Sequence, residues 1–126
     1  MTPAKYSITI FRGGTWSIGL TSESIAFEAY DEIRMHIRPP WVRGIPTKAP
    51  LLELTLDNGR ILLENSDTVL TLIVSAADTE ALTFDEGIYD LEMVKHVDTE
   101  ADPPIPVEVV DKLLYGSVTV EGERTV

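Results

Sequence analysis

The chain has 126 residues, of which 44% are hydrophobic and 25% charged, a composition typical of one globular domain that can bury its own core. It contains no cysteine, which excludes disulfides, thiol catalysis and cysteine-ligated metals. The net charge of −11 argues against nucleic acid as a partner, because phosphate contacts need a concentrated basic surface. We find no signal-peptide pattern and no run near the roughly 20 apolar residues of a membrane span, so we expect neither signal-directed export nor membrane insertion.

Apolar residues occupy every second position in three early segments, residues 6–10, 16–20 and 33–37. This period of two predicts half-buried strands. Gly13-Gly14 separates the first two segments and predicts a hairpin turn between them. The stretch 24–30 is also compatible with a strand.

Four prolines within residues 39–50 predict an exposed loop, because proline removes a ladder donor and restricts the residue before it. The next strands are predicted over residues 51–56 and 60–64. Asp57-Asn58-Gly59 between them is a strong turn signal and predicts that they form a hairpin. A further strand is predicted over residues 68–74.

Ser75 is a good helix N-cap, and Asp78 follows three residues later, so one or two helical turns are predicted there. A strand is predicted from Ile88 to Lys95. Residues 97–106 are acidic and proline-rich and predict a connecting loop. Residues 107–120 are predicted to be extended again, with a break indicated at Asp111-Lys112.

The sum is about eight or nine short, closely spaced strands, the signature of an all-β fold. We therefore predict an antiparallel β-sandwich, Ig-like or jelly-roll-like, with one short helical turn, as a single domain over residues 1–126. Helices long enough to cross between parallel strands are not indicated, which argues against a parallel α/β fold.

Charge is distributed unevenly along the chain. Residues 1–48 carry six Lys or Arg against four Asp or Glu, a net charge of +2, whereas residues 49–126 carry four against seventeen, a net charge of −13. Such a dipolar chain is suited to head-to-tail docking on its own copies. The alternative interpretation, of equal weight, is that the net charge only keeps the domain soluble.

A basic stripe, Arg34, His36 and Arg38, alternates with apolar residues and is predicted to project from one face of one strand. Its first interpretation is a docking surface for an acidic partner. The alternative is that it pairs with outward carboxylates such as Asp90 and Glu92 on a neighbouring strand.

The two tryptophans receive different predictions. Trp16 is in phase with apolar neighbours and is expected to pack on the core. Trp41 lies in the proline-rich loop and is expected to be an exposed anchor, because aromatic side chains are favoured at interfaces. The predicted partner-binding residues are therefore Arg34, His36, Arg38, Trp41, Val42 and Arg43.

We find no motif for catalysis, a cofactor or a metal. His36 and His96 are the only histidines, and no Gly-x-Ser-x-Gly nucleophile elbow accompanies them. Twenty-one acids always supply some carboxylate pair by chance, so a glycosidase pair has no specificity here. The acidic residues of loop 97–106 offer oxygens for calcium but lack the glycine and terminal glutamate of an EF-hand loop. The sequence thus predicts no catalytic residue, no cofactor and no metal site.

The order of several segments carries a resemblance to a known group of proteins. They are Arg12-Gly13-Gly14-Thr15-Trp16, the strand 33–38, the strand 51–54, Asn58-Gly59-Arg60-Ile61, and the runs 72–82, 87–92 and 114–120. This layout resembles small tailed-bacteriophage and prophage structural proteins and is similar to the N-terminal β-sandwich of phage baseplate upper proteins.

The resemblance implies a non-enzymatic virion component that is made in the host cytoplasm. It would link or decorate other virion structural proteins in the tail, baseplate or head-fibre region, as a symmetric homo-oligomer. The alternative is a carbohydrate-binding module that recognises a cell-surface glycan through Trp41 and nearby carboxylates. A small hydrolase is disfavoured because a nucleophile and its histidine are not indicated.

Overall fold

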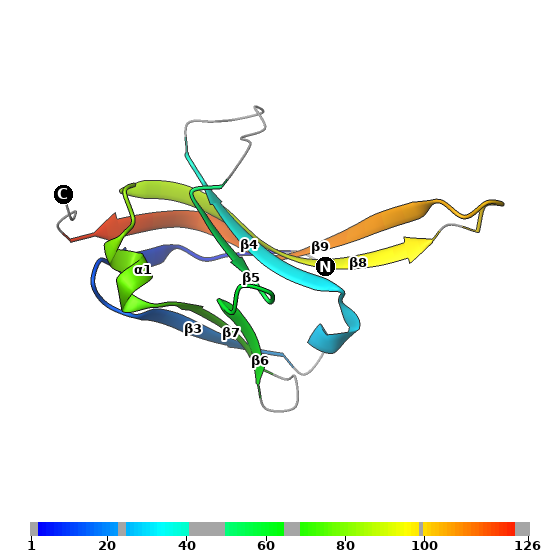
Figure 1. Ribbon diagram of the computed structural model, residues 1–126, viewed down its shortest axis with the longest axis horizontal. Helices are drawn as coiled ribbons and strands as arrows, with labels where there is room; N and C mark the ends of the chain where they lie inside the picture. Colours follow the sequence, from blue (N-terminus) through cyan, green and yellow to red (C-terminus); the bar gives the residue numbers. More distant parts are fainter. Residues whose placement is uncertain (1–2, 23–24, 41–49, 65–68, 99, 123–126) are drawn as a thin grey trace.

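The computed structural model describes residues 3–22, 25–40, 50–64, 69–98 and 100–122, which form two packed β-sheets (Figure 1). The elements in chain order are β1 (Ala4–Lys5), β2 (Ile8–Phe11), β3 (Trp16–Thr21), the 3-10 helix η1 (Phe27–Ala29), β4 (Glu32–Arg38), β5 (Leu52–Thr55), β6 (Ile61–Glu64), β7 (Val69–Val74), the helix α1 (Ala76–Glu80), β8 (Glu86–Asp98) and β9 (Pro106–Glu121).

The larger sheet has the strand order β1-β9-β8-β4-β5, with β2 also paired to β9, and the smaller sheet has the order β3-β7-β6. The prediction of an all-β sandwich with one short helix is confirmed. All ladders are antiparallel except those of β1 and β2 with β9, which are parallel and were not predicted. The two sheets lie face to face, with α1 near one end (Figure 1).

The core lies between the sheets and follows the period of two. In β4 the buried residues are Ile33, Met35 and Ile37, and their outward neighbours are partly or fully exposed. In β7 the buried residues are Leu70, Leu72 and Val74. β4 and β7 thus each contribute every second side chain to one continuous hydrophobic cluster. Trp16 packs against that cluster as predicted.

The two predicted hairpins are wrong, although both turns exist. Gly13 and Gly59 have the positive φ angles, 84° and 78°, that favour glycine in turns. The turn at Gly13 joins β2 of the larger sheet to β3 of the smaller one, and the turn at Gly59 likewise joins β5 to β6. A turn signal fixes a chain reversal but not the ladder partner, so each turn here connects the two sheets.

The pattern of residues 24–30 had suggested a strand. The described part, residues 25–30, contains the 3-10 helix η1 instead. Its backbone closes two short-range bonds, Ala29 N to Ala26 O at 3.1 Å and Tyr30 N to Phe27 O at 3.2 Å. Burial of Phe27 in the core fixes this 3-10 turn. The predicted N-cap of α1 is confirmed, since the Ser75 side chain accepts a bond from Asp78 N at 3.2 Å.

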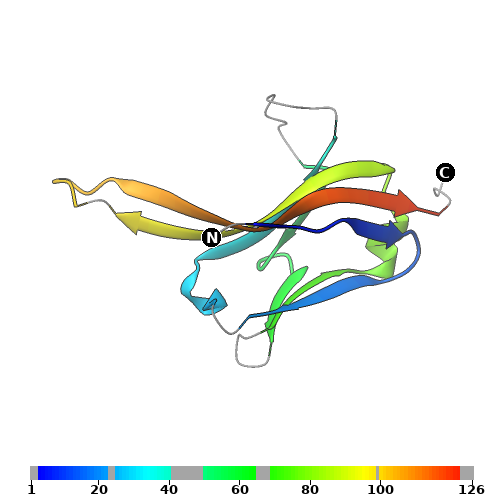
Figure 2. The same cartoon turned by 180° about the vertical axis from the view of Figure 1, so that it is seen from behind.

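Strand β2, near the start of the chain, lies beside β9, the last strand. β2 pairs with β9 from Ile8↔Val118 to Phe11↔Glu121, and Figure 2 shows the two strands side by side. An outer strand of the larger sheet is therefore supplied by the first described segment. The pairing covers the whole length of β2.

Arg12 fixes this arrangement at the end of β2. Its side chain is only 3% exposed, and Nε donates to the carbonyl of Leu82 at 3.0 Å. Nη2 donates to the carbonyl of Phe84 at 2.8 Å and to Asp85 Oδ1 at 2.9 Å, and Nη1 donates to the carbonyl of Gly122 at 2.6 Å. One guanidinium thus joins β2, the segment after α1 and the end of β9.

Gly116 provides the close approach that lets the segment between β1 and β2 pass along β9. Between β1 and β2 the carbonyl of Tyr6 turns toward the sheet and accepts a bond from the Tyr89 hydroxyl at 2.6 Å. A Cβ on Gly116 would overlap the Tyr6 oxygen and lie 2.9 Å from the Tyr6 carbonyl carbon. Burial, assisted by neighbouring Tyr6 and Asp90, raises the pKa of Tyr89 to about 12.

We predict that Gly116→Ala lowers the free energy of unfolding by about 3 kcal/mol, because the new methyl group displaces backbone atoms. The matched control is Gly19→Ala in β3, where a Cβ would lie 3.7 Å from the nearest Val69 atom, an ordinary contact. That variant should change the free energy by less than about 1 kcal/mol. Urea denaturation followed by circular dichroism measures both free energies, and equal effects of the two changes would contradict the close approach at Gly116.

We also predict that Arg12→Lys destabilises the fold by about 3 kcal/mol, because lysine cannot serve four acceptors and leaves the partly buried carbonyls of Leu82 and Phe84 without their full set of donors. Arg60→Lys is the control. Arg60 is 29% exposed and donates to the carbonyl of Glu53 and to Asp78, so its loss should cost less than about 1 kcal/mol. A similar denaturation midpoint for the two variants would show that the Arg12 network is not special.

Candidate functional site: a braced hairpin arm

The hairpin formed by β8 and β9 extends well beyond the sandwich (Figure 1). β4 pairs with β8 only as far as Val94, and β1 meets β9 only from Leu114 onward. Beyond these points the two strands pair only with each other, up to Asp98↔Pro106. We call residues 95–110 the arm.

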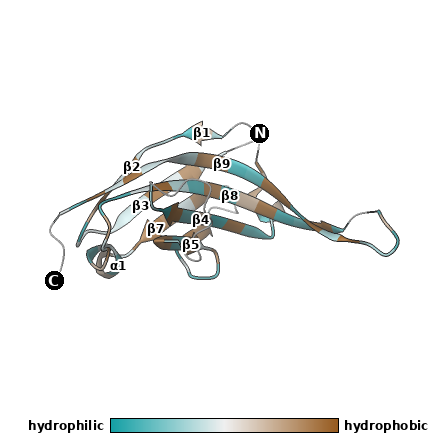
Figure 3. Cartoon of the chain, turned by 90° about the horizontal axis from the view of Figure 1, so that it is seen from above, coloured by the Kyte–Doolittle hydropathy of each residue, from teal (hydrophilic) through white to brown (hydrophobic). Residues whose placement is uncertain are grey.

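The arm exposes apolar side chains. Val97 lies opposite Val107, and Lys95 lies opposite Val109, so these residues share one side of the ladder. Val97, Val107 and Val109 are 44%, 39% and 41% exposed, and Ile105 just before β9 is 58% exposed. The hydropathy colouring also shows apolar residues on this projection (Figure 3). Apolar side chains held in a row away from the core make the arm a candidate contact surface.

The arm is also acidic. Residues 95–110 include one lysine and four acids, Asp98, Glu100, Asp102 and Glu108. All four acids are exposed. The exposed row of valines is therefore accompanied by negative charge, which suits a partner whose apolar surface has a basic rim.

The base of the arm is braced by the segment that follows η1. The Tyr30 hydroxyl donates to Asp111 Oδ2 at 2.8 Å, and the Lys95 ammonium lies 4.8 Å from the centre of the Tyr30 ring. The bond to Asp111, with burial and the charge of that carboxylate, raises the pKa of Tyr30. Asp31 N donates to the carbonyl of Val94 at 2.8 Å, and Asp31 Oδ2 accepts from His96 N at 2.6 Å. These contacts fix the direction in which the arm leaves the body.

The predicted basic stripe lies on the outer face of β4, as expected from its alternation. Arg34 Nη2 donates to Glu108 Oε1 at 3.1 Å, and Nε lies 3.6 Å from Glu92 Oε1. His36 Nε2 lies 3.6 Å from Glu53 Oε1, and Arg38 Nη2 lies 3.0 Å from His36 Nδ1. Arg34 therefore pairs with carboxylates of other strands, as the alternative interpretation predicted. The remaining predicted site residues, Trp41, Val42 and Arg43, lie outside the described residues.

A groove of about 530 Å³ lies along β4 and β5 on this outer face. Its lining presents polar and apolar surface in equal measure and consists of Asp31, Glu32, Ile33, Arg34, His36, Glu53, Thr55, Leu56, Asp57 and Asn58. Among the described residues, no tryptophan, tyrosine or phenylalanine side chain contributes to this lining. The described part of the groove therefore offers hydrogen bonds but no large aromatic ring for stacking.

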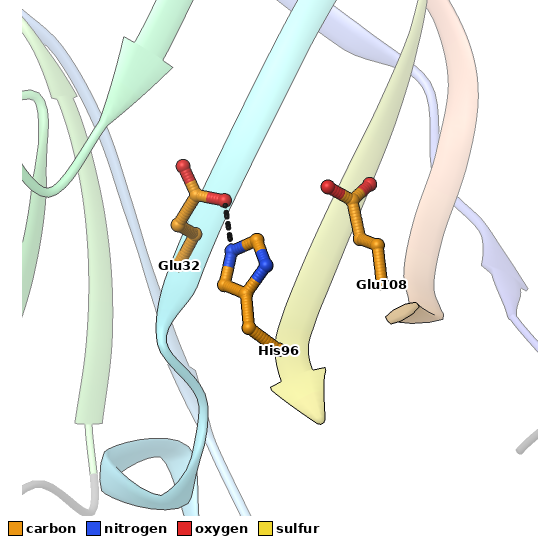
Figure 4. A group of neighbouring side chains, drawn as sticks. All are labelled: Glu32, His96 and Glu108. Atoms are coloured by element: carbon orange, nitrogen blue, oxygen red, sulfur yellow. Dashed lines mark hydrogen bonds and ion pairs between the residues drawn. The ribbon is translucent and has the colours of Figure 1, made fainter. Parts of the chain in front are cut away.

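Three side chains with metal-binding atoms meet at the base of the arm: Glu32 of β4, His96 of β8 and Glu108 of β9 (Figure 4). Their ligand atoms all lie within 4.8 Å of one another. In the described part of the chain this is the one such group of three or more. All three residues are exposed to solvent.

The sequence did not indicate the arm. Residues 97–106 had been interpreted as a loop because of their acids and prolines, whereas β8 continues to Asp98 and β9 begins at Pro106. The alternation of valine with polar residues in Val107-Glu108-Val109 was the available signal. The break indicated at Asp111-Lys112 is a register shift, because Leu91 faces Leu114 while Glu92 faces Lys112.

No protein-family model matches this chain. A search of the curated proteins likewise finds no match. Within the described residues, none of the helices has the length and apolar character needed to cross a membrane.

Proposed function

We propose that this protein is a non-enzymatic structural component of a bacteriophage-type virion, an adaptor or decoration that acts through protein-protein contacts. The phage assignment derives from the resemblance in segment order. The observation that carries the docking role is the arm, a braced hairpin that holds a row of valines away from the core.

The arm suits assembly for a physical reason. A free two-stranded hairpin is only marginally stable, so a projecting ladder is normally maintained by other contacts. Here Tyr30 and Asp31 supply such contacts at the base of the arm. A pre-ordered arm loses little conformational freedom on binding, which favours docking on a neighbouring subunit.

The partner fitted to this arm is another virion protein with an apolar groove bordered by basic residues. The exposed valines would fill the groove, and the acids of the arm would meet the basic border. The outer face of β4 is a weaker candidate surface than the arm, because Arg34 already pairs with Glu92 and Glu108. Several symmetric copies of the chain in one particle remain part of the proposal.

The carbohydrate-binding alternative needs an aromatic platform beside hydrogen-bonding groups. The groove along β4 and β5 has hydrogen-bonding groups, but its described lining contains no tryptophan, tyrosine or phenylalanine. Trp41, on which this alternative depends, lies outside the described residues. The observations therefore favour the docking role over glycan recognition.

The virion assignment is tested by quantitative mass spectrometry of purified particles from the source lysate. We expect this chain at a fixed ratio to the major capsid protein that corresponds to a symmetric ring or vertex. Its absence from intact particles would refute the virion assignment.

The docking role of the arm is tested by the double variant Val107→Glu, Val109→Glu. We expect incorporation into particles to fall at least about tenfold, because two charges would have to be desolvated in an apolar contact. The melting temperature should change by no more than a few degrees, since both side chains are exposed.

The matched control for these arm variants is Ile88→Glu, in the part of β8 that lies in the body. Ile88 is 42% exposed, almost the same as Val109. It should incorporate normally. Normal incorporation of the double variant, or an equal loss of incorporation in Ile88→Glu, would show that the arm is not the docking surface.

A further inference from the structure

The outer side of the arm base brings together three potential metal ligands from three adjacent strands. His96 of β8 lies opposite Glu108 of β9 in the ladder, and Glu32 of β4 pairs with the position two residues before His96. Figure 4 shows the His96 ring standing between the two carboxylates. The three side chains therefore reach one point above the sheet.

The spacing of these atoms suits a small divalent ion. His96 Nε2 lies 3.0 Å from Glu32 Oε2, and all ligand atoms of the three residues lie within 4.8 Å of one another. Zinc binds imidazole nitrogen and carboxylate oxygen at about 2.0–2.2 Å, so two ligands of one tetrahedral ion are about 3.4 Å apart. Exposed side chains reach such positions by rotamer changes without moving the backbone.

Residues outside the group hold two of its members in place. Asp31 Oδ2 accepts the backbone N–H of His96 at 2.6 Å, which fixes the strand where the imidazole begins. Arg34 Nη2 donates to Glu108 Oε1 at 3.1 Å and leaves the second carboxylate oxygen for an ion. Hydrogen bonds of this kind orient metal ligands and limit their freedom before the ion arrives.

We propose that Glu32, His96 and Glu108 form a zinc-class site that clamps the base of the arm to the body. Two carboxylates balance the charge of a divalent ion, and one imidazole favours zinc over magnesium or calcium, which prefer oxygen ligands alone. The positions not filled by protein face solvent and take water. By joining β4, β8 and β9, the ion reinforces the attachment that Tyr30 and Asp31 provide on the arm base.

The proposal does not rest on the docking role of the arm, because metal binding is a property of the isolated chain. The test is isothermal titration calorimetry of ZnCl₂ into protein made without a histidine tag and treated with a chelator. We expect one saturable site per chain. His96→Gln and Glu108→Gln should each weaken it at least about tenfold.

The chain contains a matched control in its other histidine. His36 lies 3.6 Å from a single carboxylate, Glu53, with Arg38 against its other ring nitrogen. His36→Gln should therefore leave zinc affinity unchanged. MgCl₂ should produce no saturable heat under the same conditions.

A second measurement separates binding from a fold defect. ZnCl₂ should raise the melting temperature of the unchanged protein and of His36→Gln, but not that of His96→Gln, while all three melt alike in chelator. Absence of saturable binding to the unchanged protein would overturn the proposal. Unaltered zinc affinity in His96→Gln, or its loss in His36→Gln, would overturn it as well.

Discussion

The rest of the structure depends on the continuous ladder between β8 and β9. Its paired positions run from Glu86↔Thr119 in the body to Asp98↔Pro106 at the far end of the arm. Along the first part of the ladder, every second side chain of β8 is buried in the core, and neighbouring strands cover both edges. Along the second part β8 and β9 pair only with each other, and Asp31 accepts the outward N–H of His96 at the arm base. This pairing, together with the braced base, keeps the projecting segment ordered although its apolar side chains are exposed.

The alternation of apolar residues was sufficient to predict most strands and the class of fold. Strands such as β3 and β4 turn one face toward the core and the other toward solvent, so apolar and polar residues alternate along their sequences. Strand partners were not predictable in the same way. Whether β2 joins β3 or β9 depends on which sheet surfaces can pack together, and Gly13-Gly14 is compatible with either outcome. The 3-10 turn at Phe27 was missed because one buried aromatic overrides the pattern around it.

The candidate sites were less accessible from sequence than the fold. The basic stripe on β4 was correctly assigned to one face, yet Arg34 faces the carboxylates of two residues far along the chain. The arm was hidden by its own composition, since exposed strands carry the acids and prolines that also characterise loops. Glu32 and His96 lie 64 residues apart, and only the order β9-β8-β4 brings them together. Such groups follow from sheet topology, which local spacing does not encode.

The parallel pairing of β2 with β9 has a consequence for how the protein is made. Arg12 and the carbonyl of Gly122 that it binds are separated by 110 residues, so this part of the sheet closes a very long loop. During synthesis β2 emerges early and has no ladder partner until residues near Glu121 leave the ribosome. Contacts of such high sequence separation slow folding and expose strand edges while the chain waits. A nascent copy therefore has an open strand edge from the synthesis of β2 until that of β9.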